Sequence, residues 1–193
     1  LDEDELDDLK EAASVDADPA ARAKLAYAVT QALPADGSVT MDDLIDDPVM
    51  THIGGLQAAG GRAGLAAEVL RGQQVIETGS VKMPPVADRT GAAFTALQGY
   101  FADEPQGEQT EEAIRASADA LYAARVRRTD PTAPIDENVY RQALHEVMGG
   151  TGKYGTKNAT GGMQIVRGAL VPLPLSAKAR DVERALGQLQ LDM

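Results

Sequence analysis

Apolar residues recur three or four positions apart along most of the chain, which is the spacing of one face of an α-helix. The clearest example is the stripe of Val139, Tyr140, Ala143, Leu144 and Val147. Segments with the same spacing occupy most of 19–33, 41–45, 48–56, 65–78, 87–100, 110–126 and 176–189. The pattern therefore predicts a mainly α-helical, bundle-like domain with about seven or eight helices.

Capping residues and prolines mark where these helices begin and end. In Asp18-Pro19 and again in Asp47-Pro48, an acid at the N-cap precedes proline at the first helical position. Further caps are expected at Thr40 and Ser176, and Ile135-Asp136 leads into another helix. Pro84-Pro85 interrupts the helical pattern, because proline lacks the backbone donor that a helix needs, and it indicates a sub-boundary near residues 80–86.

A change of pattern follows the stripe that ends at residue 147. Residues 149–162 contain six Gly, three Thr and one Asn, so we expect a long, flexible, Gly-rich loop. The short apolar runs 163–166 and 169–171 flank Arg167-Gly168. They predict at most one short β-hairpin, near residues 163–171.

Charge is concentrated at the start of the chain. The 193 residues carry a formal net charge of −12. Residues 1–18 hold nine acids and one base, a balance of −8, which leaves −4 for residues 19–193. We expect an acidic leader or linker over 1–18, either weakly amphipathic and helical or disordered, followed by a helical domain over 19–193.

Composition excludes several classes of site. The chain has no cysteine, which excludes disulfides and thiolate metal sites. No run approaches the roughly 18 apolar residues of a membrane span. The one basic cluster is Arg125, Arg127 and Arg128, which we interpret as interacting with the dipole of a helix C-terminus, so no nucleic-acid binding is expected. Since the chain begins at Leu1 without a targeting segment, we expect it to be a segment of a longer polypeptide or a processed chain.

Two motifs resemble binding or catalytic patterns, and each lacks required residues. The run 149–153 resembles a phosphate-binding loop, but Val147 stands where the first glycine belongs and Tyr154 stands where Ser or Thr belongs. His145-Glu146 begins like the zinc-binding H-E-x-x-H helix, but Gly149 occupies the second histidine position. We therefore interpret the glycine run as a connection, and we expect His145 on the surface or at the edge of its helix.

Other candidate sites are equally incomplete. Asp42-Asp43 and Asp46-Asp47 lack the spacing of a calcium loop, so we interpret them as helix-start charges. Gly72 interrupts a helical segment at a cost of about 1 kcal/mol relative to Ala, which predicts a close crossing with another helix. A binding role for the Arg and Gln side chains of residues 71–74 is the alternative. We predict no catalytic, cofactor-binding or metal-binding residues in this chain.

Several short motifs follow one another in a recognisable order between residues 47 and 190. They are DPVMTHIGGLQAA (47–59), LRGQQVI (70–76), Pro84-Pro85, ADALYAAR (118–125), DENVYRQALHEVMGG (136–150) and, after the Gly-rich loop, LVPLPLS (170–176). This order resembles a segment of large bacteriophage and prophage virion proteins, which are tail or internal ejection proteins. The chain departs from that family where Arg167-Gly168 replaces an aromatic-Asn-Gly turn and where Leu173 separates two prolines.

The resemblance implies a non-enzymatic structural or assembly domain, associated with the tail or ejected with the genome. Its partners would be other virion proteins or sister domains of one long polypeptide, in the virion or in the bacterial cytoplasm during assembly. Some family members carry a lytic transglycosylase domain elsewhere, but that activity needs a general-acid Glu, typically followed by Ser, and no Glu-Ser pair occurs here. Two alternatives stay open: a peptidoglycan-cleaving enzyme or its accessory domain, and a helical ligand- or peptide-binding module with 149–162 as a lid.

Overall fold

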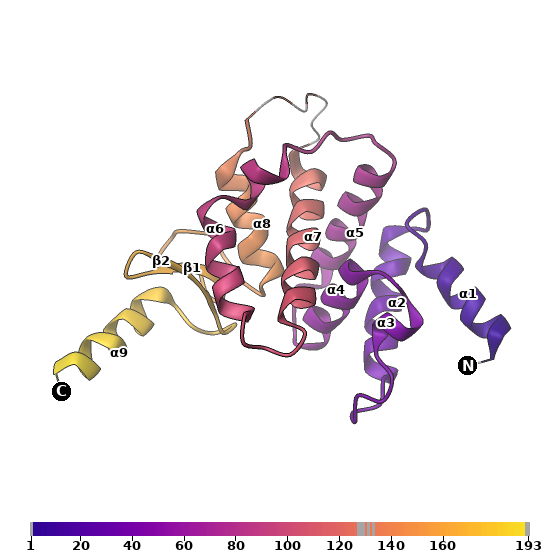
Figure 1. Cartoon of the computed structure of the whole chain (residues 1–193), viewed down its shortest axis with the longest axis horizontal. Helices are drawn as coiled ribbons and strands as arrows, with labels where there is room; N and C mark the ends of the chain where they lie inside the picture. Colours follow the sequence, from indigo (N-terminus) through magenta and orange to yellow (C-terminus); the bar gives the residue numbers. More distant parts are fainter. Residues whose placement is uncertain (1, 127–129, 131, 133, 192–193) are drawn as a thin grey trace.

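The computed structural model of the chain describes residues 2–126, 130, 132 and 134–191. These residues form nine helices and one antiparallel hairpin (Figure 1). In chain order the elements are α1 (Glu3–Ala13), α2 (Pro19–Ala32), α3 (Met41–Leu44), α4 (Pro48–Ala58), α5 (Ala63–Glu77), α6 (Val86–Phe101), α7 (Gly107–Val126), α8 (Glu137–Val147), β1 (Gly162–Val166), β2 (Ala169–Leu173) and α9 (Ala179–Leu191). The prediction of a mainly helical domain with a hairpin near residues 163–171 is confirmed.

The longest helix, α7, lies at the centre of the bundle. It packs against α4, α5, α6 and α8, while α2 covers α4 and α5 on the side of the N-terminus (Figure 1). The core between these helices is largely aliphatic, and its largest fully buried apolar side chains are Met50, Ile53, Val69, Leu70, Leu97, Leu121, Tyr122, Leu144 and Met163. Each such side chain stabilises the fold by about 1.5–3 kcal/mol relative to exposure.

Most predicted caps are present as hydrogen bonds. The Asp18 carboxylate accepts from Ala21 N at 2.8 Å at the start of α2, and Thr40 forms a reciprocal capping box with Asp43 before α3. Asp47 and Asp136 accept from the first backbone donors of α4 and α8. These contacts confirm the interpretation of Asp43 and Asp47 as helix-start charges, because each carboxylate satisfies a backbone donor that the helix leaves unpaired.

Two predicted helix starts are wrong. Ser176 does not cap the last helix, because residues 174–177 form a turn in which Ala177 N donates to Pro174 O at 2.8 Å, and α9 begins only at Ala179. The central helix α7 begins at Gly107, three residues before the expected start at Thr110. Gln106 adopts a left-handed φ of 66° and turns the chain directly into α7.

The hairpin closes through the two residues that the sequence indicated. Val166 pairs with Ala169, and the connecting Arg167 and Gly168 have φ values of 50° and 84°. Two successive left-handed residues match the right-handed twist of a two-residue hairpin, and glycine adopts this conformation without a steric penalty.

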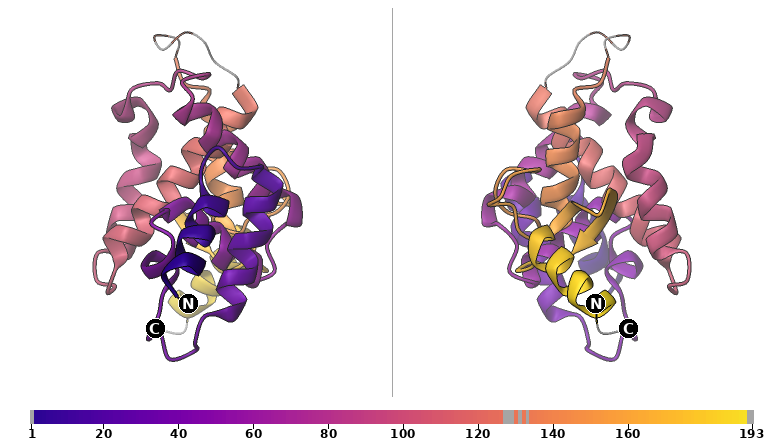
Figure 2. Two further views of the ribbon diagram at one scale, coloured as in Figure 1. Left: turned by 90° about the vertical axis from the view of Figure 1, so that its right-hand side faces the viewer. Right: turned by 90° about the vertical axis from the view of Figure 1, so that its left-hand side faces the viewer.

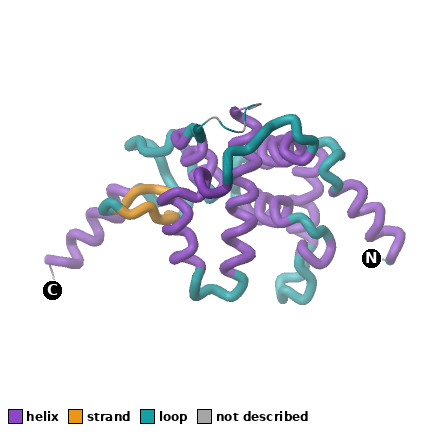
Figure 3. The backbone as a smooth tube through the Cα atoms, turned by 45° about the horizontal axis from the view of Figure 1, so that its top comes forward, coloured by secondary structure: helices purple, strands orange, loops and turns teal. Residues whose placement is uncertain are grey.

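The terminal helices project from opposite ends of the bundle (Figures 1 and 3). Figure 2 views the molecule from these two ends, with α1 in front in one view and α9 in front in the other. The acidic leader contains a helix, α1, which packs Leu9 and Ala13 against the bundle. None of the described helices combines the length and apolar character needed to cross a lipid bilayer.

Candidate functional site

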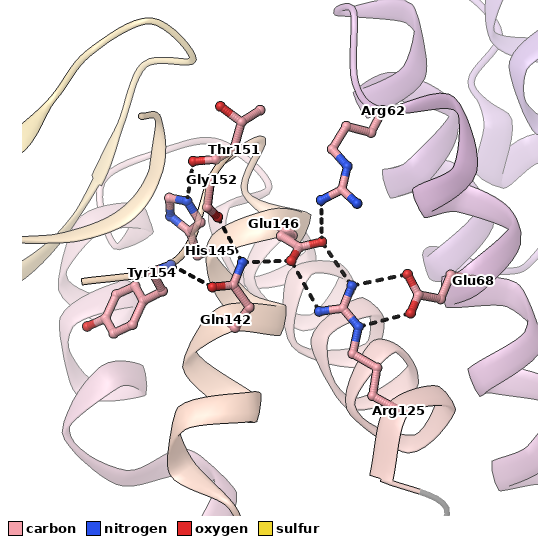
Figure 4. Close-up of polar contacts among 9 residues, drawn as sticks. All are labelled: Arg62, Glu68, Arg125, Gln142, His145, Glu146, Thr151, Gly152 and Tyr154. Atoms are coloured by element: carbon pink, nitrogen blue, oxygen red, sulfur yellow. Dashed lines mark hydrogen bonds and ion pairs between the residues drawn. The ribbon is translucent and has the colours of Figure 1, made fainter. Parts of the chain in front are cut away.

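A group of buried and half-buried charges lies where α5, α7 and α8 meet (Figure 4). We call it the ionic cluster, and it consists of Arg62, Glu68, Arg125 and Glu146. The guanidinium of Arg125 contacts Glu68 through Nε and Nη2 at 2.9 and 3.1 Å, and Glu146 through Nη1 and Nη2 at 3.2 and 2.9 Å. Arg62, just before α5, donates from Nη1 to Glu146 Oε2 at 2.7 Å. Two positive and two negative groups thus join three helices.

Arg125 and Glu146, the central pair of the ionic cluster, are charged at neutral pH. Burial raises the pKa of Glu146, whose side chain is only 6 % exposed, but hydrogen bonds from Arg125 and Gln142 and the charges of Arg125 and Arg62 outweigh burial, so that its pKa lies below the ordinary value. Burial also opposes the charge of Arg125, but its two carboxylate partners outweigh this effect and raise its pKa. Glu146 is therefore an ionised acceptor, unlike the protonated carboxyl that a general acid requires.

Gln142 connects the ionic cluster to the Gly-rich loop. Gln142 lies one turn before Glu146 on α8. Its amide nitrogen donates to Glu146 Oε1 at 2.7 Å and to Gly152 O at 3.1 Å. Its amide oxygen accepts from Tyr154 N at 2.5 Å. The loop 149–162 is thereby tied to α8 at two successive points, and a Thr151–Thr160 bridge joins its two arms.

His145 lies beneath the same loop and is fully buried, so the expectation of a surface or edge position is wrong. Its Nδ1 lies 3.1 Å from Met163 O and its Nε2 lies 3.1 Å from Thr151 O. In either neutral tautomer the ring donates one of these hydrogen bonds. Gly150 and Gly162 make the burial possible, because a Cβ at either position would overlap His145.

A groove of about 830 Å³ runs beside the start of α8 and the Gly-rich loop. Among the described residues, it is lined by Arg125, Asp136, Asn138, Val139, Gln142, Gly152, Lys153 and Tyr154. Its only described carboxylate, Asp136, accepts from Asn138 N and Val139 N at 3.1 and 3.2 Å as the cap of α8. The acid in this groove is thus already engaged in a structural role.

Two further polar clusters hold helices together elsewhere. Arg22 is fully buried; its Nε donates to Ala13 O at 2.9 Å, and its Nη2 donates to Asp47 Oδ2 at 2.8 Å and Gln73 Oε1 at 2.9 Å. Arg89 pairs with Asp119, which also accepts from the Tyr140 hydroxyl at 3.0 Å. The side chain of Gln73 therefore contacts groups inside the fold. A binding role for the Arg and Gln side chains of residues 71–74 was the alternative to a close helix crossing.

Local sequence reasoning did not identify the ionic cluster. It placed Arg125 near a helix C-terminus, and Arg125 does lie in the last turn of α7, but its carboxylate partners are 57 and 21 residues away. Arg127 and Arg128, the rest of that predicted basic cluster, lie outside the described residues. Among the residues that are described, no group of three or more His, Asp or Glu side chains is placed to hold a metal ion.

Comparison of the chain with protein-family models, with curated proteins and with solved structures found no match. The geometry of the site shows buried charges in matched pairs, each joining elements that are far apart in sequence.

Proposed function

We propose that this chain is a non-enzymatic structural domain of a bacteriophage or prophage virion protein, and that it acts by packing against other virion proteins or sister domains. The family proposal rests on the order of short motifs between residues 47 and 190. It places the chain in the phage particle, or in the bacterial cytoplasm while particles assemble.

The observation that carries the assembly role is the distribution of exposed apolar side chains. Four of the eight large hydrophobic side chains that are exposed in the described part of the chain lie between residues 165 and 189, on the hairpin, α9 and the segment between them. Exposed apolar side chains that cluster at one end of a domain are typical of a protein–protein interface. The interior, by contrast, has its ionic groups in matched pairs that stabilise one arrangement of helices.

The carboxylates near the groove support a non-enzymatic role. Glycoside cleavage needs one carboxyl that is protonated and faces the substrate. Glu146 is ionised and accepts hydrogen bonds from Arg62, Arg125 and Gln142, and Asp136 caps α8. Neither carboxylate is free to serve as the general acid that the peptidoglycan-cleaving alternative would require, since both already accept hydrogen bonds inside the fold.

Particles released by induction of the source bacterium would test the proposal. We expect peptides of this chain to co-purify with DNA-filled particles on a density gradient, at a constant ratio to the major capsid protein. The chain would be detected by mass spectrometry in both lysate and particles. Abundant chain in the lysate with none in the particles would refute the virion assignment.

A separate assay addresses the enzymatic alternative. We expect the purified chain to leave the turbidity of a peptidoglycan suspension unchanged. Asp136→Asn and Glu146→Gln variants that circular dichroism shows to be folded serve as controls, since a glycosidase that used either carboxylate would lose its activity. Clearing by the native chain that one of these variants abolishes would contradict a purely structural role.

A further inference from the structure

Charge changes sign along the long axis of the molecule. Residues 1–47 hold fourteen acids and three bases, a net charge of −11, whereas residues 149–193 hold six bases and three acids, a net charge of +3. The first segment contains α1, α2 and α3. The second contains the Gly-rich loop, which holds Lys153 and Lys157, and then the hairpin and α9. Helices α1 and α9 lie at opposite ends of the bundle (Figures 1 and 3). We call these the acidic end and the basic end.

At the acidic end, α1 presents one wholly acidic face to solvent. Its half-buried Leu9 and buried Ala13 face the bundle. The opposite face carries carboxylates at helical spacing, all of them exposed: Asp4, Asp7, Asp8 and Glu11. Tyr27 and Val39, on α2 and the connection after it, add exposed apolar side chains at 44 and 37 %.

At the basic end, apolar and basic side chains are exposed together. Leu175, Leu186 and Leu189 are 43, 37 and 63 % exposed. Arg180 and Arg184 extend from α9 with 59 and 70 % of their side chains exposed, and both lie only loosely near Asp181, at 3.6 and 3.7 Å. Such exposed pairs contribute little, so these arginines can take another carboxylate partner at small cost.

We propose that copies of this chain associate head to tail, with the acidic end of one copy docked against the basic end of the next. The two surfaces are complementary in charge, and each carries exposed apolar side chains that would be removed from water. Contact between two acidic ends would instead bring two segments together that each carry a net charge of −11, and these segments would repel each other. The inference names the partner for the assembly role proposed above, on which it rests: the partner is a second copy of the same chain.

Head-to-tail contact has a definite consequence for assembly. The two surfaces that meet are different, so each copy that binds leaves a free end of each kind. The assembly therefore grows into a ring or an open filament instead of stopping at a dimer. Because exposed charges are screened by salt, association weakens as the ionic strength rises.

Sedimentation velocity of the whole chain tests this directly. We expect the mean mass to increase with protein concentration at about 0.05 M salt and to fall toward the monomer at about 0.5 M salt. Arg180→Glu with Arg184→Glu changes the basic end, and Asp8→Lys with Glu11→Lys changes the acidic end. Each pair should weaken association on the order of tenfold or more. Reversal of Asp103 and Glu104 to Lys alters charge equally at exposed positions between the two ends, and should leave association unchanged.

Combining the variants separates head-to-tail contact from other modes. In a mixture of the two double variants, the unaltered acidic end of one faces the unaltered basic end of the other, and the two reversed ends are complementary as well, so the mixture should associate again although each variant alone is weakened. The chain that carries all four reversals has restored complementarity and should associate again. Circular dichroism confirms that each variant is folded, since all four side chains are exposed.

The outcomes are distinct. A monomer at every concentration in low salt, or a basic-end variant that still associates like the native chain, overturns the inference. Dimers of the acidic-end variant alone that are as stable as those of the native chain would show that two basic ends pair with each other, which also overturns it. Recovery of the chain from phage particles would leave the proposed function standing in either case, and its absence from particles would refute that function without affecting self-association.

Discussion

Gly72 of α5 lies directly against the backbone carbonyl of Ala120 in α7, so closely that a Cβ on Gly72 would overlap both the oxygen and the carbon of that carbonyl. This contact confirms the close helix crossing that the glycine predicted. It also explains why a residue of low helix propensity stands inside a helix, because any side chain would push α5 away from the central helix.

Gly72→Ala should destabilise the fold strongly. The methyl group cannot be accommodated by a change of rotamer, since the obstacle is backbone, and the two helices would have to separate. We expect the free energy of unfolding to fall by at least about 2 kcal/mol, at the upper range of overpacking. Urea unfolding followed by circular dichroism would measure the loss.

Gly64→Ala is the matched control in the same helix. Nothing lies within 4 Å of a Cβ at that position. Alanine there has the better helix propensity, so we expect no loss of stability and a gain of up to about 1 kcal/mol. Equal effects of the two substitutions would show that α5 and α7 leave room for a methyl group at Gly72, which would contradict the close contact with Ala120.

Glu146→Gln should destabilise the bundle and alter its response to acid. The change leaves Arg125 and Arg62 without the charge that they share, which for a largely buried pair costs about 3 kcal/mol at neutral pH. Because the folded state lowers the pKa of Glu146, its contribution is fully present above the ordinary value of 4.5 and is lost as the pH falls through the lowered value. The stability curves of native chain and variant should therefore converge below pH 4.5.

The exposed pair of Arg141 and Glu137 provides the control for this measurement. Their side chains lie 3.0 Å apart, one turn from each other on α8, and are 39 and 67 % exposed. Glu137→Gln should change the unfolding free energy by no more than about 0.5 kcal/mol. A loss as large as that of Glu146→Gln would mean that surface charge on α8, and not the ionic cluster, determines stability.

The contrast between helix caps and ionic groups shows what sequence alone can predict. Thr40 and Asp47 were identified because a cap acts on backbone donors two or three residues away. The partners of Arg125 depend on how three helices pack, and the burial of His145 depends on Gly150 and Gly162 approaching from the loop and the hairpin. Such contacts join positions whose spacing carries no local signal.

His52 should make stability depend on pH in the mildly acidic range. Its Nε2 donates to Val147 O at 2.8 Å and so joins α4 to the end of α8. Burial lowers the pKa of His52, although the hydrogen bond to Val147 opposes this change. Since the unfolded chain binds the proton more readily, the contribution of His52 is fully present above its ordinary value of 6.5 and is lost as the pH falls through the lowered value.

His52→Gln isolates this effect, because glutamine keeps an N–H donor without titrating. We expect the stability difference between the native chain and the variant to shrink as the pH falls from about 7.5 to about 5.5. Chemical unfolding at a series of pH values would measure the difference. If the unfolding free energies of the native chain and the variant ran parallel across this pH range, His52 would not be the source of the pH dependence, and another group would cause any acid sensitivity.

Gln142→Ala should release the Gly-rich loop while leaving the bundle folded. The substitution removes the hydrogen bonds from the Gln142 side chain to Gly152 O and from Tyr154 N. The loop contains Lys153 and Lys157, so trypsin reports its freedom directly. We expect cleavage after Lys153 to accelerate on the order of tenfold, which corresponds to about 1.4 kcal/mol of lost restraint, because proteolysis follows the population of locally open states.

Arg141→Ala, at the neighbouring exposed position of α8, tests whether the effect belongs to the loop contacts. This side chain pairs with Glu137. It should leave the cleavage rate after Lys153 unchanged, even if the helix loses a few tenths of a kcal/mol. Gln142 also donates to Glu146, so cleavage after residues outside the loop must be followed as well. Faster cleavage confined to 149–162 would show that Gln142 restrains the loop, whereas faster cleavage everywhere would show that it acts mainly through the ionic cluster.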